Sequence, residues 1–243
     1  MKNTYNKSEL SQFKNIYQST IEFKKFLNKY LQNSKRIIDV GMGIGGTLSY
    51  YTKLYKNTHF IGIDHRKKNV DSANKIYQNL EINQNTSFIK INVLKEIKNK
   101  KLKNIDGIIS EKTFCTFKNI EKPLKNLIQL KPKWIGINSL FFKGYMNVLI
   151  HQRQLQKKKF RILNQDDDPD GDFNIHSLKS VENALKGTGY KISKFQFFFP
   201  KKKLNTNRLT FGSYTMKTEL NKNTCFSGPV HLPWGFLLIK KNY

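Results

Sequence analysis

Two kinds of hydrophobic pattern alternate along the first 140 residues. Short apolar runs, rich in isoleucine and of the length of buried strands, span 36–40, 59–63, 87–91, 105–109 and 134–138. The stretches between them predict helices at 47–55, 67–80 and 120–130. Strands that alternate with helices at these intervals predict an α/β fold with a parallel sheet and helices on both faces.

The two ends of the chain differ from this regular middle. Residues 8–31 carry apolar side chains at three-to-four spacing and predict an amphipathic helix, with Ser8 as a candidate N-cap. The second half predicts a very basic helix over 145–163 and a helix over 177–186 that ends at Gly187 and Gly189. Three predicted strands follow, at 190–199, 209–218 and 235–240. We expect a single domain over 1–243, with an N-terminal helical segment at 1–34.

The net charge of +27 comes from 44 Lys and Arg against 17 Asp and Glu. A balance this basic suits nucleic acid, because lysine and arginine neutralise phosphates. However, 39 of the basic residues are Lys and five are Arg, beside 26 Asn and two Ala. Arginine is preferred for bidentate phosphate and base contacts, whereas lysine and asparagine have AT-rich codons. The composition therefore favours a solvated lysine surface and disfavours a nucleic-acid partner.

The composition also indicates the cellular compartment of the protein. No apolar run approaches 18 residues, so no membrane span is predicted. The first residues contain no apolar signal region, and two cysteines suit a reducing environment. We therefore expect a cytoplasmic protein.

The strongest chemical signal lies between the first predicted strand and its helix. The string there is Asp39-Val-Gly41-Met-Gly43-Ile-Gly45-Gly46. Glycines allow torsions closed to other residues and a close approach to a ligand, and the helix N-terminus adds free N–H donors. The string also satisfies the dinucleotide pattern GxGxxG, but a carboxylate before the first glycine would repel a pyrophosphate and suits an ammonium or sulfonium group. Asp64 ends the second strand, where a carboxylate can accept both hydroxyls of a ribose.

Together with 105–111 on the fourth strand, these features resemble class I S-adenosylmethionine-dependent methyltransferases of the small-molecule branch. The resemblance implies a Rossmann-like, doubly wound, mostly parallel seven-stranded sheet with a β-rich C-terminal elaboration. It implies S-adenosylmethionine as the cofactor, a cofactor-binding core at 35–140 and an acceptor-binding half at 141–243. The implied cofactor-binding residues are Asp39, Gly41, Met42, Gly43, Gly45, Asp64, His65, Asn92, Val93 and Glu111.

The sequence departs from the family pattern at two places. Asn92 stands where an Asp often contacts the adenine amine, and its carbonyl oxygen can still accept that bond. The small-molecule branch carries a Ser-Glu-x-x-x-x-His segment after strand four, but here Thr116 and Phe117 follow Ser110 and Glu111 at the expected position of the His. A catalytic role of that His must come from elsewhere or be absent.

The acceptor side is predicted from the second half of the chain. A hydroxyl acceptor needs a general base, and His176 and His231 are the candidates. The connection at 225–234 is expected to fold over an aromatic acceptor pocket. The candidate substrate residues are Phe114, Phe141, Tyr145, His151, Tyr214 and Trp234. Cys115 is interpreted as inert and half-buried rather than as a nucleophile, and no metal site is predicted.

The sequence thus predicts a methyltransferase that acts on a small-molecule acceptor, at oxygen. Two alternatives stay open. An RNA methyltransferase could use the Lys-rich stretch between 145 and 161 to follow phosphates. A Rossmann-like module could instead bind its ligand without catalysis.

Overall fold

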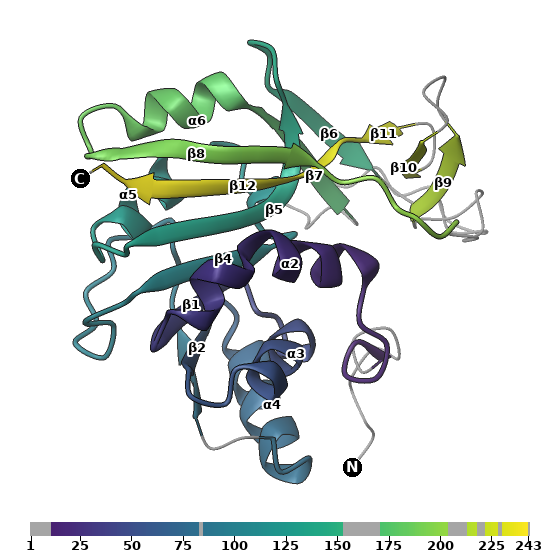
Figure 1. The fold of residues 1–243 in the computed structure, drawn as a ribbon. Coiled ribbons are helices and arrows are strands. Elements are labelled where there is room, and N and C mark those ends of the chain that lie inside the picture. The colour runs from purple at the N-terminus through teal and green to yellow at the C-terminus, as the bar shows by residue number, and fades with distance from the viewer. Residues whose placement is uncertain are drawn as a thin grey trace, which may run out of the picture.

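The computed structural model describes residues 11–82, 85–152, 171–203, 213–217, 222–227 and 230–242. Its centre is a mixed sheet whose main path runs β3-β2-β1-β4-β5-β12-β8 (Figure 1). These strands are β1 (Arg36–Val40), β2 (His59–Asp64), β3 (Thr86–Lys90), β4 (Gly107–Glu111), β5 (Trp134–Phe142), β8 (Tyr190–Phe197) and β12 (Trp234–Lys241). The first five pair in parallel, whereas β12 runs antiparallel to β5 and β8. The predicted seven-stranded, mostly parallel sheet is confirmed.

Helices cover both faces of this sheet, and neighbouring strand residues point to opposite cores. On one face, α2 (Gln18–Gln32) and α3 (Gly46–Leu54) pack with Ile37, Ile109 and Leu238. On the other face, α5 (Glu121–Ile128) and α6 (Leu178–Leu185) pack with Ile38, Ile108 and Leu237. Helix α4 (Lys67–Asn79) lies against β2 and β3. Within the described ranges, none of the helices has the length and apolarity to cross a membrane.

The helix ends follow local chemistry. Ser177 caps α6, since its hydroxyl oxygen accepts the N–H of Ser180 at 3.0 Å. Gly187 and Gly189 follow that helix with φ of +71° and +78°, in agreement with the predicted stop. The first helix differs from its prediction, because α2 begins at Gln18 rather than at residue 8. The proposed cap Ser8 lies outside the described residues.

The β-rich C-terminal elaboration stands at one end of the large sheet (Figure 1). Strand β6 (Val148–Gln152) pairs antiparallel with β7 (Gly171–Ser177), which in turn runs parallel to the end of β5. A separate sheet contains β9 (Ser213–Lys217), β10 (Asn223–Ser227) and β11 (Val230–Leu232). The elaboration thus borders the carboxyl ends of the parallel strands.

Two local predictions in this region are wrong. A helix was predicted over 145–163, but 148–152 is strand β6, and 153–163 lie outside the described residues. Val148 and Ile150 stand opposite Ile175 and Phe173 of β7, so cross-strand apolar pairing overrides the helical pattern. The connection predicted as a loop over 225–234 contains most of β10, all of β11 and the start of β12.

Candidate functional site

The loop between β1 and α3 turns on three glycines in the left-handed region. Gly41, Gly43 and Gly45 have φ of +72°, +59° and +85°, a region that other residues rarely adopt. Gly41 donates its N–H to the carbonyl of Ile63 at 2.8 Å, which ties the loop to β2. A Cβ atom at Gly41 would lie 2.2 Å from Thr113 Oγ1, so the loop also passes tightly against the chain after β4.

Gly43 is the open point of this loop. Apart from its two chain neighbours, no atom of the described residues lies within 4 Å of the position that its Cβ would occupy. A Cβ at Gly45, by contrast, would meet the ring of Tyr77 at 2.8 Å, and the Tyr77 hydroxyl donates to the Gly45 carbonyl at 2.8 Å. The side of the loop at Gly43 is therefore where a ligand can approach the main chain.

Three acidic residues surround the loop at the carboxyl ends of the parallel strands: Asp39, Asp64 and Glu111. Burial, followed by the charges of Glu111 and Asp64, raises the pKa of Asp39 well above its ordinary value. Among the described residues, no hydrogen bond or opposite charge lowers that pKa. A buried carboxyl in this situation gains from a positive group beside it.

The Asp64 carboxylate holds the glycine loop in place. Its Oδ2 accepts the N–H of Gly43 at 3.1 Å, and its Oδ1 accepts the N–H of Arg66 at 2.8 Å. His65 lies beside it, with Nδ1 3.6 Å from Asp64 Oδ1, and its side chain is exposed. Each carboxylate oxygen retains a lone pair for a further donor, such as a hydroxyl of a ligand.

The Glu111 carboxylate accepts hydrogen bonds from residues on three elements. The sequence had singled out none of these donor residues. Thr20 of α2 and Asn138 of β5 donate to Oε2 at 2.9 Å and 3.2 Å. Tyr51 of α3 donates to Oε1 at 2.7 Å. Burial raises the pKa of Glu111, against these hydrogen bonds and the charge of Lys112, which lower it. Glu111 thus ties the end of β4 to α2, α3 and β5.

The remaining predicted cofactor residues lie at the same edge with different surroundings. The Met42 side chain packs among Val70 and Ala73, so only its main chain belongs to the loop surface. Asn92 Oδ1 accepts the N–H of Leu94 at 2.9 Å, which fixes its side chain after β3. Val93 is buried in the core.

Comparison with known proteins identifies this arrangement. A family model described as a methyltransferase domain matches residues 31–190, which is more than half of the chain. The chain belongs to this methyltransferase family. The enzyme is an S-adenosylmethionine-dependent methyltransferase, as the glycine loop and its acidic residues predicted.

Solved structures share the fold of the methyltransferase at low identity. An S-adenosylmethionine-dependent methyltransferase from Methanosarcina mazei is 13% identical with a TM-score of 0.58, over 89% of this chain and 96% of that one. One from Aquifex aeolicus is 14% identical with a TM-score of 0.51, over 98% and 100%. Coclaurine N-methyltransferase bound to N-methylheliamine and S-adenosylhomocysteine is 13% identical with a TM-score of 0.55, over 74% and 51%. The methyltransferase thus spans about half the length of that chain, and no curated protein sequence matches it.

The residues of the loop fit the cofactor S-adenosylmethionine. The open side of Gly43 leaves the main chain accessible, and the Asp39 carboxyl has no positive partner among the described residues. The cofactor carries an ammonium and a sulfonium group, so its charge complements the three acidic residues. We expect Asp39 and the glycine loop to hold the methionine part and Asp64 to hold the ribose.

A cavity of about 390 Å³ lies at the same edge of the sheet, and its walls are mostly apolar. It is lined by Phe141, Phe142, Met146, Val148, Ile175, Phe197, Phe198, Phe199, Thr224, Cys225, His231, Leu232, Pro233 and Trp234. Strand β5 links it to the cofactor loop, because Asn138 contacts Glu111 and Phe141 reaches the cavity three residues later. Three residues of strand span about 10 Å, so acceptor and cofactor can adjoin.

The structure brings only part of the predicted acceptor site together. Phe141, Trp234 and the base candidate His231 line the cavity. Tyr145 is 86% exposed and does not line it, and Tyr214 is buried against Phe226, with ring centroids 5.8 Å apart. Phe114 is buried in the core. His151 lies in β6, where the structure does not describe its side chain.

His176 occupies a different environment from His231. It is buried, with Nε2 3.0 Å from the carbonyl of Phe114, and burial lowers its pKa. A neutral ring whose Nε2 donates to a main-chain carbonyl anchors the η1 turn (Phe114–Thr116). Its position suits support of the strand-four loop, whereas His231 is among the residues that line the cavity.

Two buried thiols, Cys115 and Cys225, lie close enough to Lys112 to influence its pKa. Burial raises the pKa of Cys115 to about 12 and that of Cys225 to about 11, which keeps both thiols protonated. Cys115 Sγ donates to the Lys112 carbonyl at 3.2 Å. These contacts agree with the interpretation of Cys115 as inert. Burial lowers the pKa of Lys112, whose Nζ lies 3.6 Å from the ring centroid of Tyr17.

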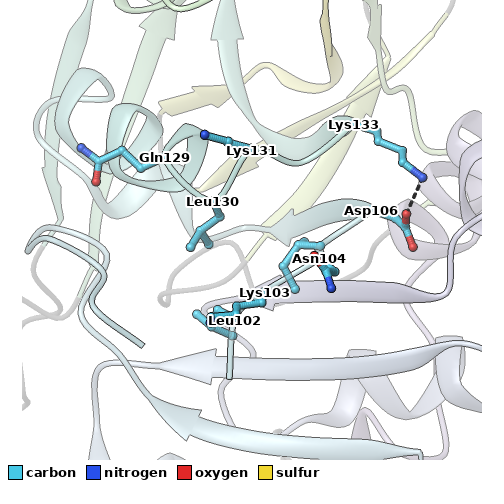
Figure 2. A pocket seen from close by; sticks show the side chains of 9 residues that line it. Leu102, Lys103, Asn104, Asp106, Gln129, Leu130, Lys131 and Lys133 are labelled. Carbon is cyan, nitrogen blue, oxygen red and sulfur yellow. Dashed lines mark ion pairs between the residues drawn. The ribbon is translucent and has the colours of Figure 1, made fainter. Parts of the chain in front are cut away.

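A second hollow of about 520 Å³ lies at the opposite, amino-terminal edge of the sheet (Figure 2). Figure 2 shows Lys133 reaching Asp106 there, at 2.7 Å. Asp106 also accepts the N–H groups of Lys35 and Arg36, at 2.8 Å and 3.1 Å. Burial raises the pKa of Asp106, but these hydrogen bonds outweigh it and lower the pKa overall. The polar groups of this hollow thus connect the starts of β1, β4 and β5, away from the cofactor loop.

Substitution of Gly43 by alanine tests the open side of the loop. We expect Gly43→Ala to weaken S-adenosylmethionine binding about tenfold or more, because the new methyl group occupies the ligand side. Gly187→Ala is the matched control, since Gly187 has φ of +71° and, beyond its chain neighbours, no described residue within 4 Å of its Cβ position. Both variants bear a similar backbone cost of about 1 kcal/mol. Calorimetry that finds equal affinities in the two variants would exclude Gly43 from the binding surface.

Proposed function

We propose that the methyltransferase transfers a methyl group from S-adenosylmethionine to an oxygen atom of a small, largely apolar molecule bound in the cavity. This proposal rests on the mostly apolar cavity, because Phe141, Trp234 and His231 line it together at the cofactor edge of the sheet. Apolar walls bind a ring or hydrocarbon body, and a few polar groups orient it. A histidine among them can act on a hydroxyl group.

The chemistry assigned to this chain is deprotonation and alignment. Bound S-adenosylmethionine supplies a methyl group already activated by its sulfonium. His231 is largely exposed, and its partial burial lowers its pKa below the ordinary value, which favours the neutral ring that can take the acceptor's hydroxyl proton. The acceptor oxygen then forms its bond to the methyl carbon as the carbon–sulfur bond breaks. The products are a methyl ether and S-adenosylhomocysteine, and the proton resides on His231 before release to water.

The proposal draws further support from what related structures bind. Coclaurine N-methyltransferase was crystallised with N-methylheliamine, a small molecule, although its name assigns a nitrogen acceptor. Among the described residues that line the cavity of the present enzyme, there is a histidine and no Asp or Glu. A neutral base of this kind suits a weakly acidic hydroxyl such as a phenol. We therefore assign oxygen as the acceptor atom.

The direct test is turnover with a matched set of acceptors. Purified enzyme and S-adenosylmethionine are incubated with ring compounds that differ only in a hydroxyl, amino or thiol group, and with RNA. Mass spectrometry and S-adenosylhomocysteine release then identify the methylated atom. We expect methyl ethers from the hydroxyl compounds. Methylation confined to amines, thiols or RNA would contradict the proposal.

The role of His231 predicts a specific pH dependence. Because the neutral ring is the active form, kcat/KM should be high above the pKa of His231 and fall as the pH drops through it. Burial places that pKa below the ordinary 6.5. We expect His231→Gln to lose this acidic limb and about a hundredfold in kcat/KM at pH 7. His59→Gln, at the first residue of β2 and away from the cavity, should retain the wild-type profile. A limb that persists in His231→Gln would assign the titration to another group.

A further inference from the structure

The mouth of the cavity is apolar and faces solvent. Four of the residues that line the cavity are large hydrophobic side chains that remain well exposed. Their exposed fractions are 40% for Phe142, 64% for Met146, 40% for Val148 and 38% for Phe199. We call these four residues the rim. A cluster of this kind around a binding cavity marks an interaction surface rather than ordinary surface scatter.

Two lysines lie close to aromatic rings of this surface. Lys222 Nζ lies 4.9 Å from the ring centroid of Phe199. Lys143 Nζ lies 5.7 Å from the ring centroid of Phe197, which lines the cavity. Three further lysines, at 201–203, are exposed just after Phe199. The mouth therefore combines apolar side chains with a border of positive charge.

The Phe199 side of the rim is held by hydrogen bonds to neighbouring elements. Asn223 of β10 donates to the carbonyl of Pro200 at 2.8 Å. On the other flank, Gln18 of α2 accepts the N–H groups of Lys201 and Lys202 at 3.0 Å and 3.3 Å. The chain on which Phe199 and its lysines stand is thus fixed between β10 and α2. A preformed surface binds its partner without an ordering cost.

We propose that the rim docks on an anionic lipid surface and that the cavity receives its acceptor, an amphiphile with an apolar body, from that surface. The assignment of the cavity to the acceptor rests on the proposed function above. Apolar and aromatic side chains that enter the lipid interface beside lysines that attract anionic headgroups are the combination found in peripheral membrane binding. The net charge of +27 adds a long-range attraction to such a surface.

A lipid surface fits the rim better than RNA does. RNA-binding grooves pair lysines with aromatic faces for base stacking, but they do not need exposed aliphatic side chains such as Met146 and Val148. Those aliphatic groups gain free energy only where water is removed from them. The rim therefore selects a partner that is both anionic and apolar.

Vesicle co-sedimentation of the full chain tests the docking surface. Vesicles of phosphatidylcholine alone are compared with vesicles containing phosphatidylglycerol, and we expect binding to the anionic vesicles that weakens with added salt. Met146→Asp and Phe199→Asp should each weaken this binding about tenfold. Lys143→Gln and Lys222→Gln should each weaken it about fivefold. The controls are Leu54→Asp and Leu80→Asp, at comparably exposed leucines, and Lys75→Gln in α4.

The outcomes separate this proposal from the proposed function. Rim variants should keep wild-type affinity for S-adenosylmethionine by calorimetry. Lys143→Gln and Lys222→Gln, at residues that are not among those lining the cavity, should also keep wild-type turnover of a short, water-soluble acceptor. Two results would overturn the docking surface. One is vesicle binding that the control variants weaken as much as the rim variants do. The other is a protein that binds RNA but does not bind the anionic vesicles. In that case turnover of the soluble acceptor would still stand. Conversely, vesicle binding without hydroxyl methylation would refute the proposed function and leave the surface intact.

Discussion

Replacement of Asp64 by alanine is expected to weaken the binding of S-adenosylmethionine at least about a hundredfold while the fold persists. Hydrogen bonds to a charged carboxylate contribute about 1.5–3 kcal/mol each, and a ribose offers two hydroxyls. The same carboxylate accepts the N–H groups of Gly43 and Arg66. Its removal therefore also loosens the loop on which the methionine part of the cofactor rests.

A neighbouring acidic residue provides the control for this experiment. Asp71→Ala removes the same charge from α4, where Asp71 pairs with Lys67 at 2.7 Å on the surface. Calorimetry should find near-normal affinity in Asp71→Ala and none measurable in Asp64→Ala. Circular dichroism should show the folded state in both. Wild-type affinity in a folded Asp64→Ala protein would refute the assignment of Asp64 to the cofactor.

Truncation of Trp234 is expected to damage methyl transfer far more than cofactor binding. Trp234 begins β12 opposite Leu140 and lines the cavity, and it is not part of the glycine loop. Loss of its ring removes apolar surface that contacts the acceptor, with a cost of about 2 kcal/mol or more. We expect kcat/KM for the acceptor to fall at least about thirtyfold in Trp234→Ala. The affinity for S-adenosylmethionine should stay within about twofold of wild type.

Two companion variants sharpen this measurement. Trp234→Phe keeps a flat apolar wall and should recover most of the activity. Tyr145→Ala, at an exposed ring that does not line the cavity, should have no effect. A parallel loss of acceptor turnover and cofactor affinity in Trp234→Ala would show that the residue stabilises the whole edge of the sheet rather than the acceptor.

The cofactor half of the site could be predicted from the sequence because its residues are short-range in the chain. Asp39 lies near the end of one strand, the three glycines follow that strand, and Asp64 ends the next. Parallel pairing of β1 with β2 then brings them to one edge. The network around Glu111 escaped prediction, because Thr20 is 91 residues away and only the folded chain brings it within 2.9 Å. Of the three donors to Glu111, Asn138 is the one that ends a predicted strand, and strand ends are where the site was expected.

The acceptor half could be predicted only in part, for a geometrical reason. Phe141 and Trp234 line one cavity, since both lie where β5 and β12 meet at the same edge, and their role toward an acceptor stays a prediction. Tyr145 falls beyond the end of β5, and Tyr214 faces Phe226 across the small sheet. The strands of that sheet are short, and composition alone does not fix which of their faces turns inward. The helix predicted over 145–163 gave no indication of this arrangement, because 148–152 is strand β6.

The buried carboxylate of Glu111 has a consequence for how the molecule opens. It joins α2, α3 and β5 through three hydrogen bonds, so none of these elements can detach without leaving a buried acceptor unsatisfied. We expect the amide protons of these three elements to exchange with deuterium as one cooperative unit. In Glu111→Ala that unit should split, with α2 gaining rapid exchange before β5.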